Sequence, residues 1–355
     1  MPFAPDYFTA RDRFRTAAAR LGWTLEAFPV VDDLTIDAAV SPGSPAAPVL
    51  VVSSGIHGVE GIFGSAVQLA ALQSWAKTGP PSGVRCVFVH AICPSGFAQT
   101  RRFNEESVDL NRNFLMPGEE YAGSPRRYAA LDAALNPKRP PGRSEFFTIR
   151  AMLGIARFGL AALKQAIAGG QYDFPRGMFF GGHGPSRSKA ILAEQFPRWL
   201  ADAPRGVLLD LHSGLGKWAE FKLLIDAPPH TNAQLDRAAH WFGRDIIEAT
   251  APGGTAYITR GGFDSWCTRI AGRDFISFCA EVGTYPLLRV LSAVRAENMA
   301  HHWSVPGHPR TIRAKAELRE VFCPASPQWR SLVVERGTRL IEQAVAGLTV
   351  GSASN

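Results

Sequence analysis

VLVVSSGIHGVEG, residues 49–61, indicates the fold class of this chain more clearly than any other segment. Its first six residues form a short apolar run rich in β-branched side chains, which is typical of a strand buried on both faces of a sheet. The run breaks at Gly55, and a helical pattern follows over about 61–77. His57 and Glu60 therefore follow a buried strand directly, and open α/β sheets place their ligands at such strand ends.

The same alternation of strand and helix extends in both directions from this stretch. Residues 7–21 predict an opening helix, and 23–30 and 34–39 predict extended segments. Further strands are expected over 84–92, 206–213, 221–226, 256–260 and 275–283, and further helices over about 126–135, 187–201, 231–249, 286–302, 312–321 and 327–347. This order predicts one α/β domain over residues 1–355, an α/β/α sandwich with a mixed, mainly parallel sheet, and a helical insertion at about 126–200.

One segment, residues 146–168, is apolar enough to be mistaken for a membrane span. Arg150, Arg157 and Lys164 recur in it every seven residues and mark a single polar stripe. That period is typical of an amphipathic helix with a narrow wet face, and three such charges are costly in a bilayer. We expect a buried or lid helix of a soluble protein, with no membrane partner.

Composition and charge narrow the classes of function. With 355 residues, 46% apolar and 19% charged, the chain is globular and can bury a sizeable core. The net charge of +7 can attract acidic substrates. The sequence contains no run of five or more basic residues, so we expect no nucleic-acid partner. Five cysteines without a C-x-x-C pair, and no apolar stretch of signal-peptide length near the start, predict reduced thiols and a cytoplasmic protein.

Several common α/β enzymes are excluded by missing motifs. The sequence has no P-loop G-x-x-x-x-G-K-[ST], no G-x-G-x-x-G after a strand and no H-E-x-x-H. It also lacks the G-x-S-x-G nucleophile elbow, which disfavours a serine hydrolase of the α/β type.

A third polar residue joins His57 and Glu60, because His212 ends the buried strand expected over 206–213. Each of the three has an ordinary structural interpretation when taken alone: a loop histidine, a glutamate at a helix start and a core histidine. Together, two imidazoles and one carboxylate at strand ends predict a catalytic zinc site with one open position, and therefore one Zn²⁺ per chain.

A set of short strings in this sequence resembles the zinc carboxypeptidases, including their succinylglutamate desuccinylase and aspartoacylase branch. The strings are HGVE (57–60), RF (102–103), DLNRNF (109–114), DLHS (210–213) and EVGT (281–284), in the family's order. DLNRNF is the most specific of them. Bacterial members of this superfamily described as a domain of unknown function also carry a glycine-rich F-[YF]-G-G loop, similar to FFGG at 179–182. The resemblance implies a zinc carboxypeptidase-like fold.

The resemblance also implies roles for residues at the predicted metal site. His57, Glu60 and His212 would bind zinc, and Asp109 would accept the second ring N–H of His57 and fix its tautomer. Glu281 would be the general base, which takes a proton from the attacking water and passes it to the leaving nitrogen. A turn-forming aspartate and a glutamate on the surface at a strand end are the alternatives for Asp109 and Glu281.

Two further roles concern the substrate. Arg102 would stabilise the oxyanion, with the adjacent Arg101 as the alternative. The resemblance favours Arg102, because an aromatic residue, Phe103, follows it as in the aspartoacylase-like branch. Asn111 and Arg112 would grip a substrate carboxylate, since a guanidinium fork binds a planar carboxylate bidentately. A structural ion pair is the alternative for Arg112.

Two weaker candidates complete the site. Tyr257 lies 24 residues before Glu281, in the general region where digestive carboxypeptidases have a mobile tyrosine. His183, in the glycine-rich loop, is interpreted as a flexible loop residue.

The sequence therefore predicts a zinc-dependent hydrolase that cleaves an amide bond next to a free carboxylate in a peptide or N-acyl amino acid. An N-acyl amino-acid deacylase of the aspartoacylase type would use the same groups on a small substrate. A non-catalytic binding protein that retains the pocket is an alternative from another class. The sequence predicts neither the natural substrate nor the oligomeric state.

Overall fold

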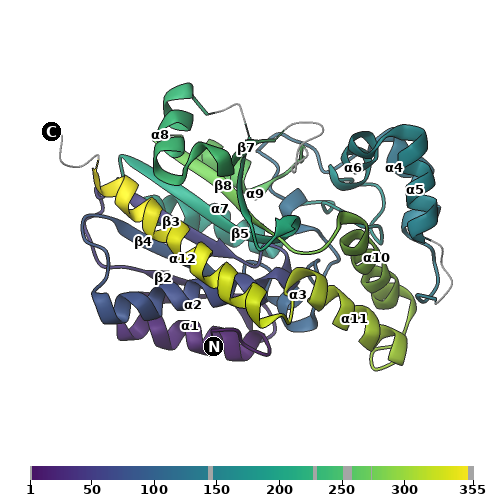
Figure 1. The fold of residues 1–355 in the computed structure, drawn as a ribbon, viewed down its shortest axis with the longest axis horizontal. Helices are drawn as coiled ribbons and strands as arrows, with labels where there is room; N and C mark the ends of the chain where they lie inside the picture. Colours follow the sequence, from purple (N-terminus) through teal and green to yellow (C-terminus); the bar gives the residue numbers. More distant parts are fainter. Residues whose placement is uncertain (1, 143–146, 227–229, 251–257, 273, 351–355) are drawn as a thin grey trace.

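A mixed eight-stranded sheet runs through the molecule with helices on both of its faces (Figure 1). The computed structural model describes residues 2–142, 147–226, 230–250, 258–272 and 274–350. The strands are β1 Thr24–Val31, β2 Leu34–Val40, β3 Val49–Ser54, β4 Arg85–His90, β5 Arg205–Trp218, β6 Phe221–Ile225, β7 Ile247–Ala249 and β8 Asp274–Gly283. They lie in the order β1-β2-β4-β3-β5-β8-β6-β7.

The helices account for most of the remaining chain. They are α1 Tyr7–Arg20, α2 Gly61–Thr78, α3 Pro94–Gln99, α4 Arg126–Leu135, α5 Phe147–Phe158, α6 Leu160–Ala168, α7 Arg187–Leu200, α8 Asn232–Phe242, α9 Phe263–Ala271, α10 Leu287–Trp303, α11 Pro309–Phe322 and α12 Pro327–Val350. Short 3₁₀ turns occur at η1 Gly58–Glu60, η2 Leu110–Arg112 and η3 Arg244–Ile246. No helix in the described ranges combines the length and apolarity needed to cross a bilayer.

The four central strands, β4, β3, β5 and β8, are parallel to one another. On one side β2 pairs antiparallel with β4, and on the other side β6 pairs antiparallel with β8. Alternate residues of β3 enter opposite cores: Leu50 and Val52 pack with α1, α2, α8 and α12, whereas Val49 and Val51 pack with α7 and α9. Burial on both faces explains why these strands are continuous apolar runs. The predicted α/β/α sandwich with a mixed, mainly parallel sheet is confirmed.

The topology brings the predicted site residues to one edge of the sheet. Strands β3, β5 and β8 are neighbours and run in the same direction, so their carboxyl ends meet. His57 follows β3, and His212 of β5 is the register partner of Glu281 of β8. Beyond this edge, α4, α5 and α6 lie together beside α10 at one end of the molecule, whereas α7 packs against the sheet (Figure 1).

The helix predicted over 146–168 is instead two helices, α5 and α6. The break falls at Gly159, whose φ of +80° no α-helix allows. Lys164 of α6 is half-buried, and it lines the same cavity as His57 and Glu281 instead of a face in open solvent.

Two other expectations along the chain differ from the structure. The helix predicted over 231–249 ends at Phe242, because Gly243 has a φ of 92°, and β7 begins at Ile247 after the short turn η3. Helix α9 was not predicted, and its start after Gly261 and Gly262 resembles a loop in sequence. Of the strand expected over 256–260, only 258–260 are described, and they are not in a strand.

Candidate metal centre

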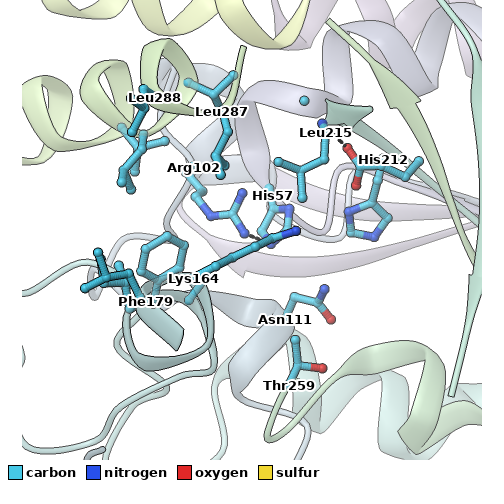
Figure 2. Close-up of a pocket in the computed structure, with 18 of the residues that line it drawn as sticks. His57, Arg102, Asn111, Lys164, Phe179, His212, Leu215, Thr259, Leu287 and Leu288 are labelled. Atoms are coloured by element: carbon cyan, nitrogen blue, oxygen red, sulfur yellow. Dashed lines mark hydrogen bonds between the residues drawn. The ribbon is translucent and has the colours of Figure 1, made fainter. Parts of the chain in front are cut away.

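His57, Glu60 and His212 meet at the carboxyl edge of the sheet, with the two imidazoles on either side of the carboxylate. Nδ1 of His57 lies 2.8 Å from Oε1 of Glu60, and Nδ1 of His212 lies 3.3 Å from Oε2. The three side chains can each place one ligand atom within 4.8 Å of the others, and all three are buried. Figure 2 shows both histidine rings at the same pocket.

Close backbone packing fixes the turn that carries His57 and Glu60. A Cβ atom on Gly58 would lie 2.1 Å from the carbonyl carbon of Gly96, so this position requires glycine. The N–H of Gly58 donates to the carbonyl of Arg102 at 3.1 Å, and the N–H of the next residue donates to the carbonyl of Arg101 at 2.7 Å. The turn is therefore held against the segment that carries both arginines.

Each histidine has a carboxylate on its other ring nitrogen. Nε2 of His57 lies 3.2 Å from Oδ1 of Asp109, and Nε2 of His212 lies 2.6 Å from Oδ2 of Asp210. Such carboxylates fix the tautomer and leave Nδ1 unprotonated toward a metal. The structure places Asp109 at the position that the resemblance implied. Asp210 had been assigned no role, although it stands two residues before His212 in the DLHS string.

The donor set suits zinc. Two imidazole nitrogens and one carboxylate oxygen are the ligands of many catalytic zinc sites, and they converge here with outer carboxylates in place. A second group, His212, Cys279 and Glu281, also lies within 4.8 Å. Burial raises the pKa of Cys279 to about 12. Both histidines of the first group have a carboxylate on their second ring nitrogen, as zinc-bound histidines usually do, so His57, Glu60 and His212 are the better candidate ligands.

The two glutamates at this site have different acidities. Burial by itself raises the pKa of Glu60, but the charges and hydrogen bonds of His57 and His212 outweigh burial and lower it below its usual range. Burial, followed by the charge of Glu60, raises the pKa of Glu281 to about 7. Oε1 of Glu281 accepts the N–H of Leu215 at 2.7 Å. The structure thus holds one carboxylate ionised and a second able to exchange a proton near neutral pH.

The two adjacent arginines point into different surroundings. Arg102 lines the cavity, where its Nε donates to Oδ2 of Asp109 at 3.0 Å and its Nη2 lies 2.6 Å from Nε2 of His57. Arg101 is fully buried away from the cavity. Its Nε donates to Oε1 of Glu297 at 3.1 Å, and its Nη1 lies 3.0 Å from Nε2 of His301. Of the two, only Arg102 is placed to contact a substrate.

Of the two residues predicted to bind a substrate carboxylate, only Asn111 lines the cavity. Asn111 lines the cavity, and its Oδ1 accepts the N–H of Phe263 at 2.9 Å. Arg112 is buried, and its Nε and Nη2 donate to the carbonyl of Ala168 at 2.9 and 2.6 Å. Its Nη1 donates to the carbonyl of Asn111 at 2.6 Å, and Arg112 is not among the residues that line the cavity. A substrate-binding role for Arg112 stays a prediction.

The glycine-rich loop supports the site from behind. The ring of Phe179 lies 5.5 Å from the guanidinium carbon of Arg102 and 5.8 Å from that of Arg112. The carbonyl of Phe180 accepts the N–H of Asp109 at 2.7 Å. The FFGG and DLNRNF strings are therefore parts of one packed unit, which explains why both occur in this chain.

The two weaker sequence candidates do not add to the described site. Tyr257 lies outside the described residues. His183 is exposed, packs its ring 4.9 Å from that of Phe180, and is not among the residues that line the cavity.

The cavity at the centre has a volume of about 200 Å³, and three charged residues that sequence reasoning missed line it: Lys164, Asp226 and Asp264. Lys164 extends into it from α6 (Figure 2). Burial lowers the pKa of Lys164, and the charge of Glu281 opposes that shift. Burial and the charge of Asp226 raise the pKa of Asp264, which lines the cavity from α9, to about 7. The seven-residue spacing of Lys164 from Arg157 predicts a solvent-exposed helix face, and Asp264 lies on a helix that was not predicted.

Comparison with known families gives one match over most of the chain. The family described as "Protein of unknown function (DUF2817)" matches residues 3–336. No curated protein sequence matches the chain significantly.

Solved structures resemble this fold at low sequence identity. Thrombin-activatable fibrinolysis inhibitor is 12% identical with a TM-score of 0.50, and the match covers 96% of this chain and 74% of that one. Carboxypeptidase A from Helicoverpa armigera is 14% identical with a TM-score of 0.49, over 92% and 75% of the two chains. Succinylglutamate desuccinylase from Chromobacterium violaceum is 16% identical with a TM-score of 0.40, over 91% and 76%. The chain has a carboxypeptidase-like α/β fold.

Proposed function

This chain belongs to the DUF2817 family, and we propose that it is a zinc-dependent hydrolase that cleaves an amide bond next to a free carboxylate. One observation carries the proposal: His57, Glu60 and His212 converge, and Glu281 is buried beside them in the same cavity. A buried carboxyl whose pKa is raised toward neutrality, next to a metal-type donor set, is typical of a catalytic site.

His57, Glu60 and His212 would hold the metal, and Asp109 and Asp210 would fix the two imidazoles in the orientation that binding needs. When bound, zinc would supply Lewis-acid chemistry, because it polarises a carbonyl and lowers the pKa of an attacking water. These ligands lie at strand ends and in a tightly packed turn, so little reorganisation is needed.

Glu281 would take the proton from the attacking water and pass it to the leaving nitrogen. Its Oε1 accepts the N–H of Leu215, and its Oε2, which lies 4.0 Å from Sγ of Cys279, is the oxygen that would take the proton. Arg102 would donate to the oxygen that gains negative charge at the scissile carbonyl. Its bond to Asp109 orients the guanidinium before any substrate arrives.

Cations at the cavity support a substrate that carries a carboxylate. Lys164 and Arg102 both line the cavity, and Asn111 offers a side-chain amide on the same wall. A carboxylate adjacent to the scissile amide would reach this end of the cavity. The net charge of +7 would favour the approach of anions over distance, an effect that salt weakens.

A small N-acyl amino acid is the second candidate substrate, beside a peptide. It is favoured because helices α4–α6 and α10 enclose the cavity with apolar side chains. A peptide would bury several backbone amides against such a wall, and amides buried without partners cost free energy. The reacting groups would be the same in both cases.

Hydrolysis profiling tests the proposal. Chelator-treated protein, with and without added Zn²⁺, would be assayed on free-acid peptides and N-acyl amino acids and on their amidated forms. We expect hydrolysis that zinc restores and that favours the free acids. Binding of these compounds without turnover by zinc-loaded protein would point to the non-catalytic alternative, and activity unaffected by the chelator would contradict a metal-dependent reaction.

A further inference from the structure

The cavity at the candidate metal centre continues away from the sheet as an apolar chamber between four helices. Leu135 of α4, Ile155 of α5, Leu163 of α6 and Leu288, Leu291 and Val294 of α10 line it. Figure 2 shows Leu288 and Lys164 at the same pocket as His57. The chamber and the candidate catalytic residues therefore share one cavity.

Packing between the chamber and the centre is continuous. Val59, which stands between His57 and Glu60, belongs to the same buried apolar cluster as Leu135 and Leu163. Phe179, which lies against Arg102, belongs to it as well. A ligand that fills the chamber would therefore end within reach of the residues that carry the chemistry.

The apolar lining of the chamber favours a hydrocarbon ligand over water or a peptide backbone. An apolar cavity left empty loses dispersion contacts and costs stability, and water gains little inside it. The side chains named above offer no hydrogen bonds, so a peptide backbone would lose its partners there. A hydrocarbon chain loses nothing on leaving water and gains burial.

Lys164 lies where the chamber meets the centre. Leu163 and Ile167, its neighbours on α6, line the apolar wall. Its ammonium group interacts electrostatically with Glu281, whose charge raises the pKa of Lys164 against the larger effect of burial. A substrate with a hydrocarbon tail in the chamber would place its amide at Glu281 and an adjacent carboxylate beside Lys164. The +7 net charge has the sign that such an anion requires.

We propose that the substrates are N-acyl amino acids whose acyl group is an extended hydrocarbon chain held in this chamber. The inference rests on the proposed function, because it assigns the acyl side of the same scissile amide. Its first test is binding, which needs neither metal nor turnover. Metal-free protein would be titrated with butyrate, hexanoate and decanoate by calorimetry, and affinity should rise about threefold per added methylene. Equal affinity for the three acids would overturn the proposal.

Two adjacent alanines of α4 provide a matched pair of variants. Ala134 lines the chamber, whereas Ala133 is exposed on the outer face of the same helix. Ala134→Leu should weaken decanoate binding at least fivefold, and Ala133→Leu should leave it unchanged. Gly154 of α5 also lines the chamber, and Gly154→Leu repeats the test if Ala134→Leu folds poorly. Unchanged decanoate binding in folded Ala134→Leu and Gly154→Leu would contradict the chamber as the binding site.

Turnover separates this inference from the proposed function. Zinc-loaded protein would be assayed on N-acetyl, N-hexanoyl and N-decanoyl glycine and on peptides with apolar C-terminal residues. We expect kcat/KM to rise steeply with acyl length, and Ala134→Leu to flatten the series. Hydrolysis that ignores acyl length, or that favours peptides, would overturn the inference and leave the amide hydrolase standing. Chain-length-dependent binding with no hydrolysis of any compound would overturn the proposed function and the role of these compounds as substrates, and would leave the chamber as a hydrocarbon-binding site.

Discussion

Nε2 of His212 lies 2.6 Å from Oδ2 of Asp210, on the side of the ring that faces away from Glu60. The other oxygen of Asp210 accepts the hydroxyl of Ser53 at 2.7 Å, so the carboxylate is fixed from both sides. His57 has the equivalent arrangement with Asp109. Each imidazole is thus oriented by a buried carboxylate and presents Nδ1 to the shared Glu60, which is the arrangement expected of metal ligands.

Loss of the outer carboxylate should weaken the metal site without dismantling it. Asp210→Asn removes the charge but keeps the shape, and we expect zinc affinity to fall about 10- to 100-fold. Competition with a chromogenic chelator would measure the change. Asp37→Asn is the matched control, because Asp37 is an equally buried carboxylate that bonds Arg15 on the β2 side of the sheet. Equal zinc affinity in the two variants would contradict the role of Asp210.

Glu281→Gln tests the general base. The amide keeps the size of the side chain but cannot take a proton, so kcat should fall about a hundredfold or more while zinc stays bound. The acidic limb of the pH profile gives a second readout, since the base acts only when ionised and activity should fall as the pH falls through its pKa. The surroundings of Glu281 raise that pKa to about 7, and a bound cation would lower it, so the midpoint should lie at or below about 7. Near-normal turnover in the variant would exclude Glu281 as the base.

The adjacent arginines should respond differently to the same substitution. Arg101→Met breaks a buried ion pair with Glu297 and should lower the free energy of unfolding by about 3–5 kcal/mol, measured by denaturant titration. Arg102→Met should instead lower kcat about a hundredfold, because it removes a donor to the oxyanion. If Arg101→Met proves as stable as the unmodified protein and loses turnover, the two assignments are reversed.

Selection of a free carboxylate should depend on Lys164. Lys164→Gln should erode the preference for free-acid over amidated substrates, measured as the ratio of their kcat/KM values, with zinc content unchanged. Arg112→Lys should lower the melting temperature, because the carbonyl of Ala168 loses a bidentate partner. Loss of the preference in Arg112→Lys, with Lys164→Gln unaffected, would restore Arg112 as the carboxylate anchor.

The sheet was predictable because burial on both faces leaves a strong pattern. VLVVSS (49–54) coincides with β3, and α4, predicted over 126–135, has those bounds. The helix predicted over 146–168 was wrong as a single element, because one glycine with positive φ interrupts an otherwise uniform apolar period. A hydrophobic pattern cannot show where a glycine turns the chain.

The metal-type donors were also predictable, because strand ends meet wherever parallel strands are neighbours. The resemblance favoured Arg102 over Arg101, but the ion pair that holds Arg101 could not be predicted, since it depends on which side of the chain faces Glu297. Lys164 was missed for a related reason. A polar stripe on an amphipathic helix predicts a solvent-exposed face. The packing of α6 over the cavity places Lys164 at the cavity wall instead.

The zinc content of the purified protein tests whether His57, Glu60 and His212 form a metal site. Purified protein and its Glu60→Ala variant would be incubated with Zn²⁺, dialysed and analysed by elemental mass spectrometry, with circular dichroism to verify folding. The account predicts about one zinc ion per chain in the unmodified protein and near-complete loss in the variant, because Glu60 contacts both histidines. Stoichiometric zinc in a folded Glu60→Ala variant, or none in the unmodified protein, would contradict it.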